Sequence, residues 1–304
     1  MSEPTAGHAR GPLSGVIPAL LTPMDARGER LDLPAARELV SRLVARGVHA
    51  FYALGTTGEA PLLTTAERQA FLEAILPAAG HVPVAVQVGA LSTAEACALA
   101  RHAAQAGAAA VAAIPPSYYA VTPREILEYY RAIARAAAPL PLYLYNIPSH
   151  ARNDLKPPFV RDLREAIPSV AGIKDSTGSP DRVKQLVRAL GAGFGVINGN
   201  DELDLASLQG GACGLVASGA GLFPELYLAL YDAWREGRTP DAEVAQRKIT
   251  AMQERLGNGA RLGWYKEVWR LRGLSLGGVR APLLGPTPAE AEAIRESLTI
   301  LGLL

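Results

Sequence analysis

The sequence predicts an α/β fold, a (β/α)8 TIM barrel with a C-terminal helical extension. Strand-like and helix-like segments alternate through residues 15–236, and eight such units fit a barrel better than a doubly wound sheet. The strand-like segments are continuously apolar, which is typical of parallel strands covered on both faces. A chain of 304 residues is also long enough to bury one large barrel core.

Each unit of the predicted barrel pairs a short apolar strand with a segment of helical periodicity. The predicted strands are residues 16–21, 50–54, 82–88, 109–114, 140–145, 170–174, 194–198 and 214–217. The helices predicted to follow them are residues 34–46, 65–78, 93–106, 123–137, 157–166, 180–190, 201–208 and 225–235.

Three of these helices begin at a sequence that fits the S/T-x-x-E capping box. The pairs are Thr64 with Glu67, Ser92 with Glu95 and Thr122 with Glu125. In the third helix Pro123 takes the first helical position, where its missing N–H carries no penalty. These helix starts are therefore predicted independently of the apolar periodicity.

The two ends of the chain differ from the barrel pattern. Only helical periodicity follows the eighth strand, and beyond the barrel's last helix it covers residues 241–255, 261–272 and 288–298. We therefore expect the helical extension to occupy residues 237–304. Residues 1–14 are polar or contain Gly and Pro, which predicts a flexible N-terminal tail rather than a signal peptide.

The composition excludes several classes of function. With 49% apolar residues, 19% charged residues and a formal net charge of +1, the chain has no basic surface for nucleic acid or a membrane. Its apolar runs are too short to span a bilayer. Cys97, Cys213 and the five histidines lack the spacing of metal ligands, so we expect buried reduced thiols, no metal or nucleotide cofactor, and a cytoplasmic protein.

Lys174 ends the sixth predicted strand, in the stretch VAGIKDSTG. Burial disfavours the ammonium form of a lysine, so a strand that carries one inward points to an amine nucleophile that attacks a carbonyl. The alternative is that Lys174 lies just past the strand end and points to solvent. This stretch alone does not distinguish a buried nucleophilic lysine from an exposed one, so the choice depends on the other segments.

Other reactive side chains also follow predicted strands, where barrel enzymes place their active sites. Residues 55–59 form the turn GTTGE, whose glycines and successive amides suit a carboxylate; alternatively, it is a plain glycine-rich turn. Tyr145 ends the fifth strand and can pass a proton in a dry pocket, although a lone tyrosine is often simply a core residue. Together with Lys174, these residues suit imine formation with a 2-oxo acid.

Several of these segments, taken in order, resemble the dihydrodipicolinate synthase / N-acetylneuraminate lyase family. The similar segments are GTTGE at 55–59, PPSYY at 115–119, YNIP at 145–148, GIKDSTG at 172–178 and GACGLVAS at 211–218. The resemblance runs from about residue 15 to the C-terminus and implies a pyruvate-dependent class I aldolase. Family members are usually homotetramers built from tight dimers.

The resemblance also implies roles for individual residues. Lys174 would form the Schiff base, and Tyr145 would be the proton shuttle. Thr56 would link Tyr145 to a tyrosine of the neighbouring subunit, which is Tyr118 or, after a shift of one residue, Tyr119. The remaining implied contacts to the bound 2-oxo acid are Thr57, Gly55, Gly58, Gly199 and Val216.

The substrate predicted from the sequence is a hydroxylated one. Where the synthases carry an arginine for the aldehyde's carboxylate, this chain has His150, which cannot replace a bidentate guanidinium, although Arg152 lies nearby. The polyol contacts of sialic acid lyases correspond to Ser176, Asp201, Glu202 and Ser218. Alternatively, the two carboxylates merely begin the next helix.

The leading prediction is a 2-keto-3-deoxy sugar acid aldolase or a related dehydratase. One alternative is 4-hydroxy-tetrahydrodipicolinate synthase, which condenses pyruvate with aspartate semialdehyde. The other is a non-catalytic barrel that binds 2-oxo acids. Imine trapping separates the two enzymes from the binding protein, because only an enzyme would lose an adduct when Lys174 is replaced.

Overall fold

The computed structural model describes residues 13–304 and contains the predicted barrel. Its eight strands are all parallel and pair in the order β1-β8-β7-β6-β5-β4-β3-β2. They are β1 Gly15–Pro18, β2 Phe51–Ala53, β3 Val84–Gln87, β4 Ala110–Ala113, β5 Leu142–Asn146, β6 Val170–Asp175, β7 Gly195–Asn198 and β8 Gly214–Ala217. The hydrogen bond from Leu20 N to Tyr52 O, 2.9 Å long, brings the chain after β1 against β2 and nearly closes the barrel.

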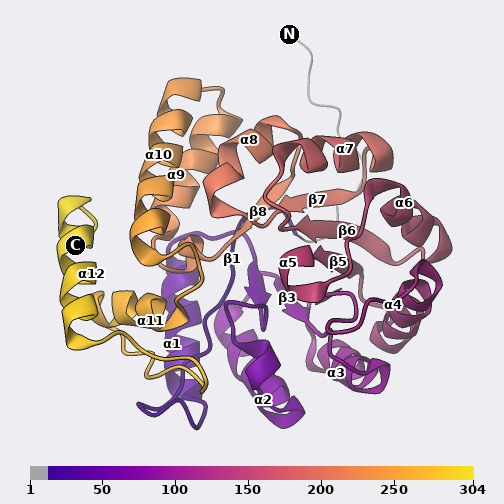
Figure 1. Cartoon of the computed structure of the whole chain (residues 1–304), viewed down its shortest axis with the longest axis horizontal. Helices are drawn as coiled ribbons and strands as arrows, with labels where there is room; N and C mark the ends of the chain where they lie inside the picture. The colour runs from indigo at the N-terminus through magenta and orange to yellow at the C-terminus, as the bar shows by residue number, and fades with distance from the viewer. Residues whose placement is uncertain (1–12) are drawn as a thin grey trace.

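Helices surround the strands, and the elements alternate around the ring (Figure 1). The outer helices are α1 Leu33–Ala45, α2 Thr65–Ala79, α3 Thr93–Ala106, α4 Pro123–Ala137, α6 Pro157–Ala166, α7 Pro180–Leu190, α8 Asp204–Gln209 and α9 Pro224–Arg235. The sequence missed only short pieces here: α5 Pro148–Ala151 and the 3-10 turns Ala60–Leu62, Asp201–Leu203 and Gly219–Gly221. The predicted helix over 201–208 is thus a 3-10 turn followed by α8.

The C-terminal extension consists of α10 Thr239–Leu256, α11 Leu262–Leu271 and α12 Pro288–Ile300. These helices gather on one side of the barrel, beside α1 and α9 (Figure 1). No helix in residues 13–304 is both long and apolar enough to cross a bilayer.

The capping boxes formed at two of the three predicted positions. Thr64 with Glu67 and Thr122 with Glu125 make both reciprocal hydrogen bonds. Ser92 caps α3 through Glu95 N, but the Glu95 carboxylate instead accepts from Thr65 Oγ1 at 3.0 Å. That contact joins the starts of α2 and α3.

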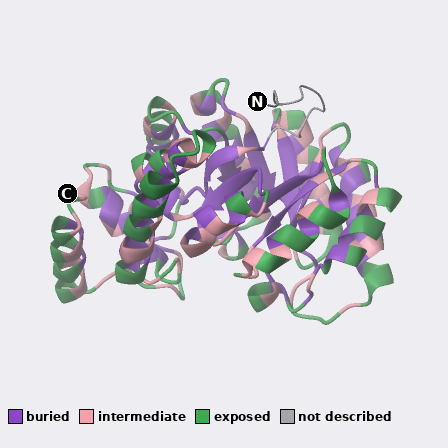
Figure 2. Cartoon of the chain, turned by 90° about the horizontal axis from the view of Figure 1, so that it is seen from above, coloured by how far each residue is buried: buried purple, intermediate pink, exposed green. Residues whose placement is uncertain are grey.

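The strands consist mainly of buried residues, while the outer helices carry both buried and exposed residues (Figure 2). The buried apolar residues form two clusters. Three tyrosines, Tyr52, Tyr143 and Tyr145, project into the barrel interior. Strands β3 and β4, which lie between β2 and β5 in the sheet, contribute alanines to the same interior cluster, and small neighbours of this kind leave room for large rings in a narrow barrel.

Two predictions about the barrel's margins need correction. The flexible N-terminal tail was predicted over residues 1–14, of which residues 1–12 lie outside the described residues. Leu13, however, is buried and its N–H lies 3.4 Å from Tyr143 Oη, so the tail does not extend to residue 14. The two cysteines also differ: Cys213 is buried as predicted, but Cys97 is only half-buried because it lies on the outer helix α3.

Candidate active site

Lys174 points into the barrel rather than to solvent. It lies in β6, beside Tyr145 of β5 in the sheet register, and is only 6% exposed. Its Nζ lies 4.0 Å from the centre of the Tyr145 ring and 4.8 Å from that of Tyr52. Within residues 13–304 no carboxylate lies within ion-pair distance of this amine. The Lys174 amine therefore packs against two aromatic rings. Their faces attract an ammonium group but do not hold it in one position, as a carboxylate would.

The turn that follows β2, residues 54–59 (the β2 turn), brings the Thr56 hydroxyl beside Tyr145. Thr56 Oγ1 lies 3.2 Å from Tyr145 Oη, so the two hydroxyls share a hydrogen bond. Leu54 and Glu59 both have φ of +57°, and this turn leaves the backbone amides of Thr56 and Thr57 without an acceptor among the described residues. Two adjacent unpaired amides form a concavity that suits an anion.

Gly199 is required where β7 ends beside the lysine. Its N–H donates to Asp175 O at 2.8 Å, which brings the β6 and β7 ends together. A Cβ at this position would collide with Ser176 Oγ and lie 2.7 Å from Lys174 Cε. Ser176 in turn donates to Gly199 O at 3.2 Å. Only glycine lets the β7 backbone pass this close to the amine.

A polar network behind β6 supports the lysine strand. Asn146 Nδ2 donates to Asp175 Oδ2 at 2.8 Å and to Asp154 Oδ1 at 3.0 Å. Arg182 clamps Asp154 with two contacts of 2.8 and 2.9 Å, and these hydrogen bonds lower the pKa of Asp154 despite partial burial. The network fixes the residues on both sides of Lys174.

The sequence predicted that Asp201 contacts substrate hydroxyls, but in the structure its carboxylate is bound by several groups of the protein. Its carboxylate accepts from Gly219 N at 2.8 Å, from Tyr227 Oη at 2.7 Å and from Gln253 Nε2. Ser218 N lies 3.3 Å from the other carboxylate oxygen. Asp201 lies at the cavity, but most of its hydrogen-bonding capacity is already used by the protein, whereas Glu202 beside it has a half-exposed side chain.

One tyrosine and one carboxyl near Asp201 have strongly shifted pKa values. Burial raises the pKa of Tyr227 well above its ordinary value, and the nearby Asp201 adds to the shift. Burial, reinforced by the charge of Asp201, also raises the pKa of Asp204 well above its ordinary value, while the hydrogen bond from Asn198 opposes the shift. Asp204 is thus a buried carboxyl that favours its neutral form.

A cavity of about 310 Å³ lies over these groups at the carboxyl ends of the strands. The predicted residues that line it are Thr56, Thr57, Tyr145, His150, Lys174, Ser176, Gly199, Asp201, Glu202, Val216 and Ser218. Gly55 and Gly58 lie in the turn below without lining it. The sequence missed part of the wall, namely Ala19, Ile147, Ser149, Asn200, Gln253, Asn258, Gly259 and Ala260. The last four belong to the helical extension, in which no catalytic or binding motif was identified from the sequence.

Tyr118 lies outside this cavity within one chain. It is 72% exposed, next to the equally exposed Tyr119 and Leu91, in a depression that His150 and Arg152 also line. Tyr118 has a φ of +72°, which is strained for a bulky residue. Its predicted role depends on a neighbouring subunit, and Arg152 lines this outer depression rather than the cavity.

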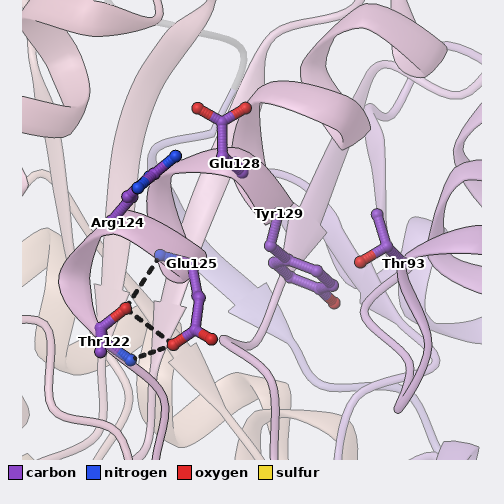
Figure 3. Close-up of a pocket in the computed structure, with 6 residues that line it drawn as sticks. All are labelled: Thr93, Thr122, Arg124, Glu125, Glu128 and Tyr129. Atoms are coloured by element: carbon purple, nitrogen blue, oxygen red, sulfur yellow. Dashed lines mark hydrogen bonds between the residues drawn. The ribbon is translucent and has the colours of Figure 1, made fainter.

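A further depression lies between the starts of α3 and α4 (Figure 3). Its polar groups are largely used in local structure: Thr122 and Glu125 form the α4 capping box, and Tyr129 Oη bonds the Ala90 backbone. No group of His, Cys, Asp or Glu in residues 13–304 is arranged to hold a metal ion. The candidate active site is therefore the cavity around Lys174.

A lyase of the aldolase type is the class of protein that the barrel and its relatives define. The model of the dihydrodipicolinate synthetase family matches residues 12–301. The chain belongs to this family. The resemblance identified from the sequence segments is thereby confirmed, as are the fold class and the enzyme class.

Individual relatives carry different activities in their names. An Escherichia coli K12 protein named "Probable 2-dehydro-3-deoxy-D-pentonate aldolase" is 37% identical over 240 residues, 78% of this chain and 79% of its own. A 4-hydroxy-tetrahydrodipicolinate synthase of Methanopyrus kandleri is 32% identical over 96% of this chain and 97% of its own. A catalytic lysine mutant of the sialic acid aldolase of Ruminococcus gnavus superposes with a TM-score of 0.91 and 28% identity, over 95% of each chain.

Proposed function

We propose that this protein is a 2-keto-3-deoxy sugar acid aldolase that works through an imine between Lys174 and pyruvate. The observation that carries the proposal is the buried Lys174 amine beside the hydrogen-bonded pair Tyr145 and Thr56. A buried amine with a phenol in reach has what carbonyl addition and proton transfer require. A dehydratase that acts on the same class of acids would use the same groups.

The proposed reaction begins when the neutral Lys174 amine adds to the C2 carbonyl of the 2-oxo acid. Tyr145 gives a proton to the resulting hydroxyl, which leaves as water and produces the imine. In the cleavage direction the C3–C4 bond breaks, its electron pair enters the imine as an enamine, and Tyr145 accepts the proton from the C4 hydroxyl as the aldehyde forms. Protonation of the enamine and hydrolysis then release pyruvate and the free lysine.

The β2 turn is the proposed site of the substrate carboxylate. Thr56 and Thr57, whose backbone amides have no acceptor among the described residues, line the cavity that contains Lys174. A carboxylate bound there would lie next to the carbonyl that the amine attacks. Gly199 and Val216 would border the bound 2-oxo acid from β7 and β8.

The charges that line the cavity favour a hydroxylated substrate over aspartate semialdehyde. Lys174 is the only Lys or Arg among the described residues that line the cavity, and Asp201 and Glu202 line it too. A second carboxylate on the aldehyde would meet these anions, with His150 as the only other group able to carry positive charge. Hydroxyls, in contrast, find partners in Glu202, Ser218 and Ser176.

The synthase is the second candidate, because the Methanopyrus kandleri relative of that name covers nearly the whole chain. It would have to bind the semialdehyde carboxylate through His150 or a rearranged Arg152. A third outcome is a barrel that binds 2-oxo acids without catalysis.

Borohydride reduction in the presence of pyruvate separates these functions. Peptide mass spectrometry should find a reduced pyruvate adduct on Lys174 in the wild type and none in Lys174→Ala. No adduct in the wild type would refute imine chemistry and leave the binding barrel. If the adduct forms, turnover of 2-keto-3-deoxy pentonates and hexonates against condensation with aspartate semialdehyde decides between aldolase and synthase.

We further propose that Tyr118 acts in a homotetramer, where it joins Thr56 and Tyr145 of a neighbouring subunit. Its strained φ supports Tyr118 over the equally exposed Tyr119, since strained backbone tends to occur at functional sites. Sedimentation should then give a tetramer, and Tyr118→Phe should slow turnover while the oligomer persists. A monomer with full activity would contradict the proposal. A cytoplasmic location completes the proposed function.

A further inference from the structure

A buried ion pair joins the helical extension to the β2 turn. Lys266 Nζ of α11 lies 2.8 Å from Glu59 Oε1, and the two side chains are 2% and 0% exposed. Glu59 ends the stretch GTTGE, so it follows the two threonines of the proposed carboxylate site by two and three residues. Burial lowers the pKa of Lys266, and the Glu59 charge opposes that shift.

Each member of the pair is also held by the backbone of residues 276–280. Lys266 Nζ donates to Gly278 O at 2.5 Å, and Glu59 Oε2 accepts from Arg280 N at 2.7 Å. Arg280 continues outward to Glu67 of α2, with its Nη2 at 2.7 Å from the carboxylate. One cluster of charges thus connects α11, the loop after it, the β2 turn and α2.

The loop that completes this cluster fits tightly between neighbouring loops of the barrel. Met24 N donates to Leu276 O at 3.0 Å, and Gly278 N donates to Asp25 O at 2.9 Å. A side chain at Gly277 would collide with Met24 O, and one at Gly278 would lie 2.7 Å from Ala26 O. The loop has no room to shift, so it is a rigid support for Lys266 and Glu59.

The β2 turn is strained at the residue that the ion pair holds. Glu59 has a φ of +57° and its N–H donates to Thr56 O at 3.1 Å. The preceding carbonyl, Gly58 O, accepts from the buried Thr22 Oγ1 at 2.7 Å. A non-glycine residue stays in this conformation only when its surroundings over-determine it, and here the buried carboxylate is fixed by Lys266 and Arg280.

A buried ion pair is weak evidence for stability, because removing both charges from water offsets much of their attraction. The ion pair has a larger effect on geometry than on stability. Because Lys266 and Glu59 are buried and have few other partners, their side chains are held in the one arrangement that brings the two charges together. The same turn leaves the amides of Thr56 and Thr57 without an acceptor among the described residues, and both residues line the cavity.

We propose that Lys266 and Glu59 are positioning residues through which the C-terminal extension sets the carboxylate-binding turn. The proposal rests on the proposed function, in which Thr56 and Thr57 bind the carboxylate of the 2-oxo acid. Neither Lys266 nor Glu59 lines the cavity, so their effect reaches the substrate only through the backbone of the turn.

The test compares pyruvate-dependent trapping of Lys174 in Lys266→Met and in the double variant Glu59→Gln/Lys266→Met. The single variant leaves a buried carboxylate unpaired and should lose stability, whereas the double variant removes both charges and should regain much of it. In the double variant we expect the pyruvate concentration for half-maximal trapping to rise by about tenfold, because small displacements of binding groups have large effects. The trapping rate at saturating pyruvate should change much less.

Lys184→Met is the matched control, because Lys184 lies on the outer helix α7 and is half-exposed. It should leave trapping and unfolding unchanged. Glu59→Asp is an independent variant: it keeps the buried charge but shortens the side chain, so the turn must move or the ion pair must lengthen. It should also weaken the response to pyruvate.

The outcomes separate this proposal from the proposed function. Absence of an adduct in the wild type refutes the imine mechanism before any variant is compared. A wild-type adduct together with a normal pyruvate response in a stable double variant or in Glu59→Asp overturns the positioning role alone. Failure of both variants to fold assigns the pair to stability and overturns the proposal as well.

Discussion

Gly199→Ala tests how closely Lys174, the lysine proposed to form the imine, is confined. The added Cβ would lie 2.7 Å from Lys174 Cε and would collide with Ser176 Oγ. Ser176 can rotate away by giving up its bond to Gly199 O. Lys174 has less freedom, because the rings of Tyr145 and Tyr52 already stand against its amine.

The structure gives the scale of the effect. Ordinary contacts of a Cβ begin at 3.4 Å, so Lys174 Cε has to retreat by 3.4 − 2.7 = 0.7 Å. Overpacking of this kind lowers the free energy of unfolding by about 1–3 kcal/mol. A displacement approaching 1 Å at a reacting atom slows chemistry by up to about a hundredfold. We expect pyruvate trapping on Lys174 to slow by at least about tenfold.

The assay is the rate of borohydride-trapped adduct at saturating pyruvate, together with urea unfolding. Gly285→Ala is the control, since a Cβ there meets nothing within 4 Å and the residue has no positive φ. It should match the wild type in both measurements. Gly199→Ala with wild-type trapping and wild-type stability would show that the β7 backbone does not confine the amine.

Substitutions at two further positions, Asp204 and Tyr52, test buried polar groups. Because the pKa of Asp204 is raised in the fold, its neutral form stabilises the protein below pH about 4, and that contribution is lost as the pH rises toward the folded pKa, by about 1.4 kcal/mol per pH unit. The difference in unfolding free energy between Asp204→Asn and the wild type should therefore grow in favour of the variant with rising pH; a constant difference would contradict the shift. Tyr52 Oη is buried without a partner in the described structure, so Tyr52→Phe should raise the free energy of unfolding by about 1 kcal/mol with normal trapping. Tyr52→Leu removes the ring from the lysine and should slow trapping; equal trapping in both variants would exclude a role for the ring.

Much of the fold was predictable because the signals are local. Apolar runs, capping residues and prolines each act within a few positions, so strands such as β6 and helices such as α4 were located to within about two residues. The 3-10 turn Asp201–Leu203 was predicted as the start of a helix over residues 201–208, because the sequence pattern does not distinguish a single 3-10 turn from the α-helix that follows it. Leu13 was missed because its burial depends on Tyr143, which lies far along the chain.

Residues that line the cavity were predictable where a polar or ionisable side chain ends or follows a strand. Lys174, Tyr145 and Thr56 end or follow adjacent parts of the barrel, and parallel strands bring such ends to one face. Gln253 was not predictable in this way, because it is a glutamine inside an ordinary amphipathic helix. Only the docking of α10 against the barrel brings it to Asp201 and to the cavity wall.

The hydrogen bonds of Asp201 bear on how the substrate is selected. A carboxylate that already accepts from Tyr227, Gly219 and Gln253 has little capacity left for a substrate hydroxyl, but it fixes the donors around it. Ser218 Oγ, 3.3 Å from the same carboxylate, is therefore oriented at the cavity wall. Under the proposed function, selection among hydroxylated substrates would therefore depend on Ser218 and on α10, which carries Gln253, because both residues line the cavity.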